Sequence, residues 1–259
     1  MKLRVTLVQQ PLVWQDPVAN RARFEALLLP LQGKTDLIVL PETFTTGFSM
    51  EVQKVGEPAG GPTSQWLQRL ANQLDAAITG SVITAEGGKY FNRLHWAEPS
   101  GELRQYDKRH LFRMGREHEY FTAGRDAWTI EWRGVRICPL VCYDLRFPVF
   151  SRRRPDLDYE VLVYIANWPA ARAYPWTQLL KARAIENQCF VIGVNRIGVD
   201  GAGIHHSGDS AAIDFLGAPL VELGDTPDVR TVELDATALK SFRERFPAHL
   251  DADHFSLET

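Results

Sequence analysis

The sequence has few cysteines and no long apolar segment. Its three cysteines in 259 residues are a small, odd number, which argues against a disulfide framework, so a reducing cytoplasm is the expected compartment. No run of 18 apolar residues is present, so a transmembrane helix is not expected. The first strand-like segment is interrupted by polar residues, unlike the apolar core of a signal peptide. We therefore expect no membrane among the partners of this chain.

The chain also lacks an excess of charge of either sign. Its 29 Lys and Arg residues and 32 Asp and Glu residues give a formal net charge of −3. Without a strongly basic face, nucleic acid is not an expected partner.

Cys138 and Cys142 are four residues apart, which is not the C-x-x-C spacing of a zinc or redox site. The glycines of segment 201–208 do not complete the G-x-G-x-x-G pattern of a dinucleotide site.

What the sequence does contain is a series of short apolar runs separated by helical patterns. Runs that are almost entirely apolar are typical of strands covered on both faces. No Ser/Gly/Pro-rich linker divides the chain, so we expect one α/β domain over residues 1–259, built from layers of helices and sheets. The expected strands cover residues 3–8, 36–40, 76–83, 135–141, 160–166, 189–195, 210–215 and 230–235. The expected helices cover residues 18–32, a segment that begins at Pro62, and residues 175–188.

Cys142 stands where the apolar run 135–141 changes abruptly to the polar sequence YDLRFP. A buried packing residue is the first explanation, because cysteine is among the most buried residue types. Its position favours a nucleophile, because ligands of α/β folds gather beyond the carboxyl ends of strands. Backbone N–H groups at such a strand-to-helix turn are expected to lower the pKa of the thiol. A nucleophilic thiol also needs a base.

The candidates for the base and for other polar groups of the site are carboxylates, a lysine and an asparagine rather than histidines. Glu42 follows the apolar segment LIVLP at the end of a buried strand, where a charge is costly unless it is paired or used, although a solvated strand end is an alternative. Lys108 enters the segment 107–126, whose weak secondary-structure pattern predicts a long functional loop. The corner Asn167-Trp168-Pro169 is either packing or a pocket wall. None of the seven histidines has a local motif typical of a base: His95, His110, His118, His205, His206, His249 and His254.

Together these segments resemble the carbon–nitrogen hydrolase (nitrilase) superfamily, whose members carry Glu, Lys and Cys in this chain order. LPETFTTGF supplies Glu42, YDKRHLF supplies Lys108 and CYDLRFP supplies Cys142. EHEYFTAG adds a further glutamate, Glu117. Within the superfamily, CYDLRFP and the tail FRERFPAHLDADHF resemble the Nit and omega-amidase branch.

This resemblance implies a four-layer α–β–β–α sandwich that is extended by homodimerisation. It also implies that Glu42 is the base for a Cys142 nucleophile and that a thioester forms. Lys108 and the backbone N–H of Tyr143 are the implied partners of the oxyanion, and Glu117 is expected to fix Lys108. No metal or organic cofactor is required. Cys138 and Cys189 are assigned to packing.

The implied substrate is the terminal amide of a small dicarboxylate monoamide, such as 2-oxoglutaramate or succinamate, from which ammonia is released. A carboxylate at the far end of this substrate requires a cation, preferably an arginine. We favour Arg172 among the candidates Arg109, Arg113, Arg116, Arg146 and Arg172. Trp168, Phe44 and Tyr143 are expected to line the apolar part of the pocket. The alternatives are an aliphatic amidase, a nitrilase or a carbamoylase with the same triad, and a non-catalytic binding subunit, which would not need all three residues.

Overall fold

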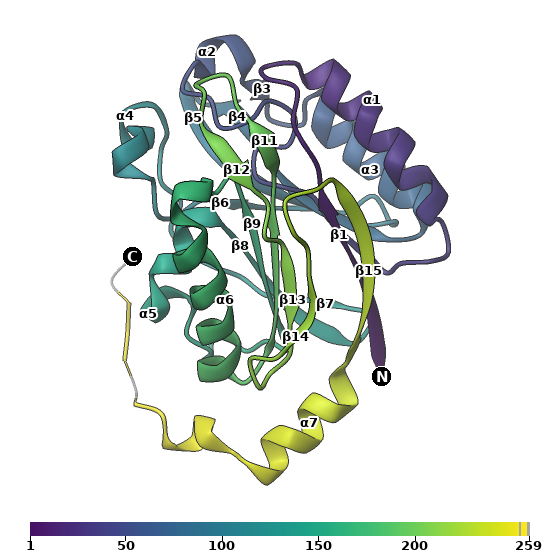
Figure 1. Ribbon diagram of the computed structural model, residues 1–259, viewed down its shortest axis with the longest axis vertical. Coiled ribbons are helices and arrows are strands. Elements are labelled where there is room, and N and C mark those ends of the chain that lie inside the picture. Colours follow the sequence, from purple (N-terminus) through teal and green to yellow (C-terminus); the bar gives the residue numbers. More distant parts are fainter. Residues whose placement is uncertain (254, 258–259) are drawn as a thin grey trace.

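Two β-sheets packed face to face form the centre of the molecule (Figure 1). The structure is a computed structural model, and it describes residues 1–253 and 255–257. The first sheet has the strand order β15-β1-β2-β4-β5-β6, with β3 beside β4, and the second has the order β14-β13-β10-β9-β8-β7. In each sheet three neighbouring parallel strands are flanked by antiparallel ones. A separate hairpin pairs β11 with β12.

The strands have the following bounds. The first sheet contains β1 (Lys2–Gln9), β2 (Leu37–Val39), β3 (Glu57–Pro58), β4 (Ala77–Glu86), β5 (Lys89–Ala97), β6 (Leu103–Asp107) and β15 (Asp228–Asp235). The second contains β7 (Ile130–Trp132), β8 (Val135–Val141), β9 (Val161–Ala166), β10 (Phe190–Asn195), β13 (Ala211–Ile213) and β14 (Pro219–Glu222). The hairpin consists of β11 (Ile197–Val199) and β12 (His205–Ser207).

Helices cover the outer faces of the two sheets. The α-helices are α1 (Pro17–Leu28), α2 (Val52–Val55), α3 (Pro62–Leu74), α4 (Glu117–Tyr120), α5 (Pro148–Ser151), α6 (Ala173–Asn187) and α7 (Ala236–Arg245). Short 3₁₀ turns cover Leu29–Leu31, Arg113–Gly115, Cys142–Arg146, Ala170–Arg172 and Ala248–Asp251.

Local sequence signals explain where the long helices begin and end. Asp16 caps α1 by accepting a hydrogen bond from the Ala19 N–H at 2.9 Å, and Pro17 occupies the first turn, where its missing N–H costs nothing. The predicted helix 18–32 stops at Leu28 and continues only as a 3₁₀ turn, because Pro30 cannot donate to the α-helical ladder.

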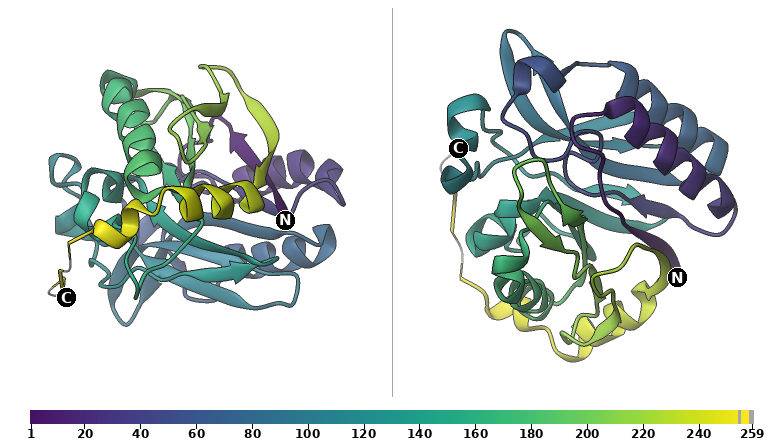
Figure 2. Two further views of the ribbon diagram at one scale, coloured as in Figure 1. Left: turned by 90° about the horizontal axis from the view of Figure 1, so that it is seen from below. Right: turned by 45° about the horizontal axis from the view of Figure 1, so that its top comes forward.

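The layers follow the order helices, sheet, sheet, helix. One core cluster joins the first sheet to α1 and α3, and the largest cluster fills the space between the two sheets and extends to α6. In Figures 1 and 2, α1 and α3 lie side by side on one side of the sheets, and α6 lies on the opposite side. This arrangement confirms the predicted four-layer α–β–β–α sandwich.

Several short strands and helices were not among the expected elements, and in the two longest of them, β5 and α7, polar residues interrupt the apolar pattern. The strand β5 carries Asn92, Arg93 and His95, all of which are buried, so apolar alternation does not reveal it. The helix α7 is largely charged, and Asp235 caps it by accepting from the N–H groups of Thr237 and Ala238. All eight expected strands are present, and segment 107–126 contains a 3₁₀ turn and the short helix α4 rather than an unbroken loop.

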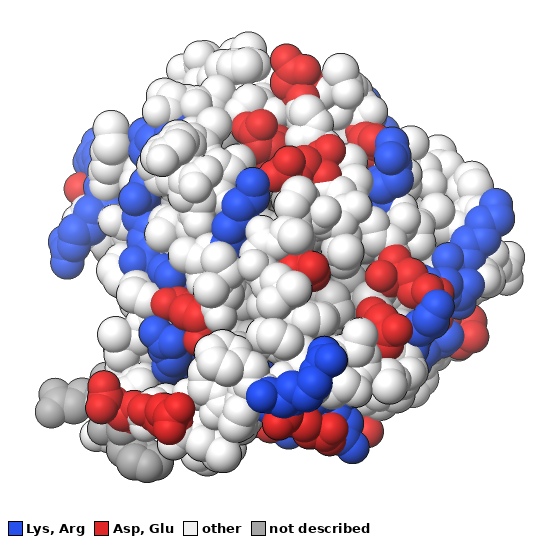
Figure 3. Space-filling model, turned by 60° about the horizontal axis from the view of Figure 1, so that its bottom comes forward, with Lys and Arg blue, Asp and Glu red and all other residues white. Residues whose placement is uncertain are grey.

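The surface charge is mixed. On the face shown in Figure 3, basic and acidic side chains are interspersed among uncharged ones, and no large area of one sign is visible. No helix among the described residues is both long and apolar enough to cross a membrane.

Candidate functional site

Cys142 occupies the sharp turn at the end of β8. The strand ends at Val141, and a 3₁₀ turn begins at Cys142 itself. The backbone φ of Cys142 is 46°, in the left-handed region that non-glycine residues rarely adopt. Such a conformation costs on the order of 1–3 kcal/mol, so the surrounding structure must hold it in place.

Asp144 is the residue that holds this turn. Its buried carboxylate accepts hydrogen bonds from the Val141 N–H at 3.0 Å and from the Tyr106 hydroxyl at 2.8 Å. The other carboxylate oxygen accepts from the backbone N–H of His110 at 3.1 Å and lies 2.7 Å from His110 Nδ1. Because Tyr106 and His110 flank Lys108 in the chain, Asp144 ties the Cys142 turn to the segment that carries the lysine.

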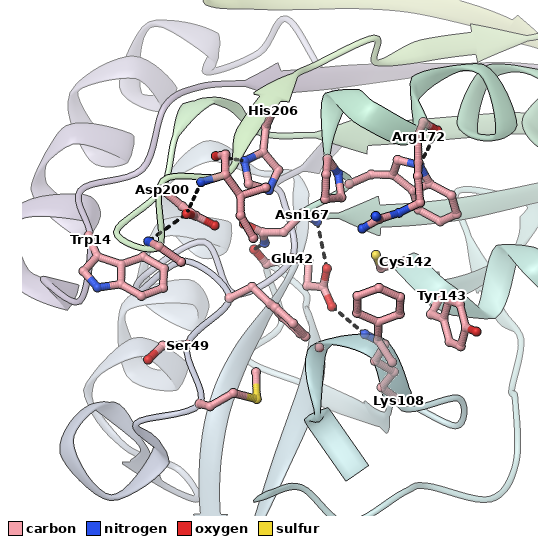
Figure 4. Close-up of a pocket in the computed structure, with 18 of the residues that line it drawn as sticks. Trp14, Glu42, Ser49, Lys108, Cys142, Tyr143, Asn167, Arg172, Asp200 and His206 are labelled. Carbon is pink, nitrogen blue, oxygen red and sulfur yellow. Dashed lines mark hydrogen bonds and ion pairs between the residues drawn. The ribbon is translucent and has the colours of Figure 1, made fainter. Parts of the chain in front are cut away.

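Beside this turn, a fully buried lysine lies between two fully buried glutamates. Lys108 Nζ is 2.8 Å from Glu42 Oε1 and 3.0 Å from Glu117 Oε2. Glu42 follows β2, Lys108 follows β6 and Glu117 begins α4, so the segment after β6 supplies two members of the cluster and a strand distant in sequence supplies the third. Figure 4 shows Glu42 and Lys108 next to Cys142. The structure therefore brings together the four residues that were expected to be catalytic.

Backbone and amide groups complete the hydrogen bonds of both carboxylates. Glu42 Oε2 accepts from the Asn167 N–H at 2.8 Å, and Glu117 Oε2 accepts from the Phe112 N–H at 2.6 Å. Asn92 Nδ2 donates to Glu42 Oε1 at 2.8 Å and to Glu117 Oε1 at 3.1 Å. Buried charges persist only when they are paired and hydrogen-bonded, and here every charge has such partners.

Burial and neighbouring charges set the protonation of the cluster. Burial lowers the pKa of Lys108, but the carboxylates of Glu117 and Glu42 raise it more, so the amine stays protonated. Burial raises the pKa of Glu117, and Lys108 opposes this effect.

The thiol of Cys142 is protonated at rest. Burial raises its pKa well above the usual value, the Glu42 carboxylate raises it further, and Lys108 opposes them only in part. The expectation of a lowered pKa for this thiol is therefore wrong, because burial and the Glu42 carboxylate dominate.

A cavity of about 350 Å³ opens onto Glu42, Lys108 and Cys142. This volume is in the range of small-molecule sites. Tyr143, Trp168 and Arg172 line it as expected.

Phe44 was also expected to line this cavity, and the structure contradicts this. It is fully buried and packs against Phe24 and Trp66, with ring centroids 5.5 and 5.9 Å away. The chain turns after Glu42 so that the Phe44 side chain enters the core between the first sheet and α1 and α3. Phe48 and Phe112 supply the aromatic wall instead.

Two of the five candidate arginines line the cavity. The Arg146 guanidinium lies 5.0 Å from the ring centroid of Trp168, and that of Arg172 lies 5.3 Å from the ring centroid of Phe112. Neither forms an ion pair with a carboxylate of the described residues. The other three, Arg109, Arg113 and Arg116, do not line this cavity.

The opposite wall was not foreseen from the sequence. It includes Trp14, Asp200 and His206, which Figure 4 shows at the left, whereas Cys142 and Arg172 lie at the right. No sequence motif pointed to His206, yet its side chain is 2% exposed, whereas that of the neighbouring His205 is exposed. The two-residue alternation of β12 was the available signal, because one of two adjacent histidines in a strand must face inward.

His206 is a neutral ring in this wall. Burial and the charge of Arg196 lower its pKa to about 4. Its Nδ1 lies 3.1 Å from the Ile204 carbonyl oxygen, which can only accept, so Nδ1 carries the proton. Of the other histidines, His254 lies outside the described residues. No group of His, Cys, Asp and Glu in residues 1–253 and 255–257 is arranged to hold a metal ion.

Comparison with known proteins identifies the family. The carbon–nitrogen hydrolase model matches residues 4–244. Omega-amidase YafV of Escherichia coli is 47% identical over 98% of each chain, and 2-oxoglutaramate amidase of Bacillus subtilis is 32% identical over 97% of this chain and 98% of its own. The crystal structure of XC1258 from Xanthomonas campestris, described as a CN-hydrolase superfamily protein with an arsenic adduct in its active site, is 54% identical, has a TM-score of 0.97 and covers all of both chains.

The chain therefore belongs to the carbon–nitrogen hydrolase family. The relatives also confirm the predicted place in the omega-amidase-like part of the nitrilase superfamily, and with it the prediction of an enzyme that acts on C–N bonds.

Proposed function

We propose that this protein releases ammonia from the terminal amide of a small dicarboxylate monoamide, of the 2-oxoglutaramate or succinamate type. The observation that carries this proposal is one cavity with two features. The thiol of Cys142, Lys108 and the Glu42 carboxylate line it, with the Glu117 carboxylate paired to the lysine, and two arginines without carboxylate partners among the described residues lie in its wall. The names of the relatives, omega-amidase and 2-oxoglutaramate amidase, support the same substrate class.

The first half of the reaction forms a thioester. As Cys142 Sγ attacks the amide carbon, Glu42 takes the thiol proton, because the resting thiol is neutral and needs a base at that moment. Glu42 then gives this proton to the amide nitrogen as the C–N bond breaks, and ammonia leaves.

Positive groups stabilise the oxyanion of the tetrahedral intermediate. Lys108 Nζ is a fixed cation in a water-poor site, where such charges act strongly. The backbone N–H of Tyr143, the residue after the nucleophile, is the second donor. Glu117 holds Lys108 in position from its other side.

The second half of the reaction returns the enzyme to its resting state. Glu42 takes a proton from water while the water oxygen attacks the thioester carbon. The C–S bond breaks, and the sulfur recovers a proton from Glu42. The product is a dicarboxylate, and no metal or organic cofactor takes part.

The arginines bind the far carboxylate of the substrate. Arg172 is our first candidate, and Arg146 lines the same cavity. Trp168 and Tyr143 contact the carbon chain between the two ends. A neutral aliphatic amide is the second candidate substrate, which the apolar side chains Phe48, Met50 and Phe112 favour.

Ammonia release from a panel of amides tests the proposal. Monoamides of four- and five-carbon dicarboxylates should be hydrolysed with higher kcat/KM than neutral amides of equal length. Cys142→Ala should lower kcat at least about a thousandfold while the circular dichroism spectrum stays unchanged. Faster hydrolysis of the neutral amides would favour the second candidate, and full turnover by a folded Cys142→Ala variant would refute the thioester mechanism.

We further propose that the whole chain is one domain that forms a cytoplasmic homodimer. The resemblance to the superfamily supports the dimer, and the small number of cysteines supports a reducing compartment. Light scattering of the purified chain should give about twice the mass of one chain.

A further inference from the structure

Asn92 occupies a position in the cluster that no motif of the sequence revealed. It lies in β5, is 0% exposed, and is not among the residues that line the cavity. Its Nδ2 donates to Glu42 Oε1 at 2.8 Å and to Glu117 Oε1 at 3.1 Å. Lys108 Nζ donates to the same two oxygens, at 2.8 and 3.1 Å.

One ammonium and one amide therefore share two carboxylate oxygens. With both glutamates ionised and Lys108 protonated, the cluster has one negative charge in excess. Lys108 alone neutralises only one carboxylate. The hydrogen bond from Asn92 lowers the pKa of Glu117 against the effect of burial, and Asn92 gives Glu42 a second donor beside Lys108. The titratable groups that face this pair are Lys108 and Cys142, and the neutral thiol adds no charge.

The other end of the Asn92 amide indicates why this residue is present. Its Oδ1 is buried and has no hydrogen-bond partner among the described residues. An unsatisfied buried acceptor is destabilising. A residue that serves only packing would avoid this cost, whereas a residue whose two N–H donors are required at the carboxylates would retain it.

We propose that Asn92 is a positioning residue that keeps Glu42 ionised as the base, beside a second carboxylate and with only one lysine to serve both. The inference rests on the proposed catalytic role of Glu42. Asn92 touches no substrate, so it acts on the turnover number and its pH dependence and leaves substrate binding unchanged.

The test begins with Asn92→Ala and Asn92→Asp, assayed for ammonia release from succinamate over pH 5–10. Asn92→Ala should lower kcat about 10- to 100-fold at neutral pH and move the acid limb of kcat/KM up by about one pH unit, with KM changed less than about twofold. Asn92→Asp keeps the side-chain shape but adds a third carboxylate around Lys108. The cluster of Lys108 and three carboxylates should then bind an additional proton. The acid limb of kcat/KM should therefore move to a higher pH than in Asn92→Ala.

A charge exchange separates charge from packing. Asn92→Asp combined with Glu117→Gln restores one amide and two carboxylates around Lys108, so the acid limb should return toward its original position. Asn187→Ala is the matched control, because Asn187 is a buried asparagine on α6 that donates to the Arg183 carbonyl and accepts from Arg153 N–H. It should destabilise the protein without moving the pH profile.

Two results would overturn the proposal. One is an Asn92→Asp variant with the pH profile of the original enzyme, and the other is an Asn92→Ala variant that raises KM and leaves kcat unchanged. If no ω-amide is a substrate, the proposed function fails, but Asn92 can still be tested by alkylation of Cys142 with iodoacetamide, followed by mass spectrometry. Asn92→Asp should move the alkylation profile to higher pH, and added Glu117→Gln should reverse this; an unchanged profile would refute the role.

Discussion

Removal of Arg172 should weaken the hydrolysis of anionic amides selectively. Its guanidinium is half-buried beside the Phe112 ring, at 5.3 Å, and has no competing carboxylate among the described residues. A hydrogen bond between charged groups contributes about 1.5–3 kcal/mol. Arg172→Ala should therefore reduce kcat/KM for succinamate about 10- to 150-fold. The far carboxylate also orients the amide at the thiol, so part of the loss should appear in kcat.

The second arginine of the cavity limits the effect of this single substitution. Arg146 remains available to the same carboxylate in the Arg172→Ala variant. Removing both arginines leaves the carboxylate desolvated and unpaired, which costs about 2–5 kcal/mol, or about 30- to 5,000-fold in kcat/KM. Arg113→Ala is the control, because Arg113 is exposed and lies outside the cavity.

The assay compares succinamate with butyramide, a neutral amide of the same chain length, by ammonia release at constant ionic strength. Arg172→Ala should leave kcat/KM for butyramide within about threefold of the original enzyme, whereas Lys108→Ala should damage both substrates equally, because the oxyanion forms with either. If the two arginine variants affect both substrates alike, the arginines only support the structure. The assignment of an acidic substrate would then fail.

Other predictions address the remaining residues. Cys138→Ala and Cys189→Ala should retain activity, since both thiols are fully buried in the core; a folded but inactive Cys189→Ala variant would contradict this. Asp144→Asn should lower the free energy of unfolding by about 1–3 kcal/mol in urea, because an amide cannot accept from all the donors that the carboxylate serves, while the exposed Asp156→Asn should change it by less than about 0.5 kcal/mol. The His206 ring has a pKa of about 4 in the fold, below its unfolded value, so its contribution to stability is present above about pH 6.5 and is lost as the pH falls toward 4. His206→Phe should therefore flatten the decline in urea stability between pH 7 and pH 4.5, and an unchanged decline would show that other groups cause it.

Apolar runs made the scaffold predictable from the sequence. The strands that are covered on both faces, such as β8 and β9, are almost entirely apolar, and Trp66, Leu67 and Leu70 form a buried apolar face on α3. The strand β5 was not predicted, because it carries buried polar side chains that the site requires. Its Asn92 serves two carboxylates that lie far away in the sequence, and no local pattern encodes such a contact.

The cavity wall was only partly predictable for a similar reason. Tyr143 and Trp168 adjoin motifs, so they could be placed beside the thiol from the sequence. Phe44 also adjoins a motif, but the turn after Glu42 directs it into the core, and sequence proximity does not give side-chain direction. His206 reaches the wall through the hairpin β11–β12, whose position depends on tertiary packing.

The neutral state of the resting Cys142 thiol has a consequence for the chemical durability of this enzyme. Oxidation to sulfenic acid proceeds through the thiolate, and burial and the Glu42 carboxylate raise the pKa of the Cys142 thiol, so little thiolate is present at neutral pH. Peroxide at neutral pH should therefore inactivate the protein slowly, and reagents that need a preformed thiolate should react poorly. A compound can instead bind in the cavity first and place an electrophilic carbon next to the sulfur. Glu42 would then accept the thiol proton as the sulfur attacks, as it does with an amide. Selective covalent inhibitors of this site are thus expected to resemble the substrate in shape. Raising the intrinsic reactivity of a general thiol reagent should increase its rate of reaction with Cys142 only slightly.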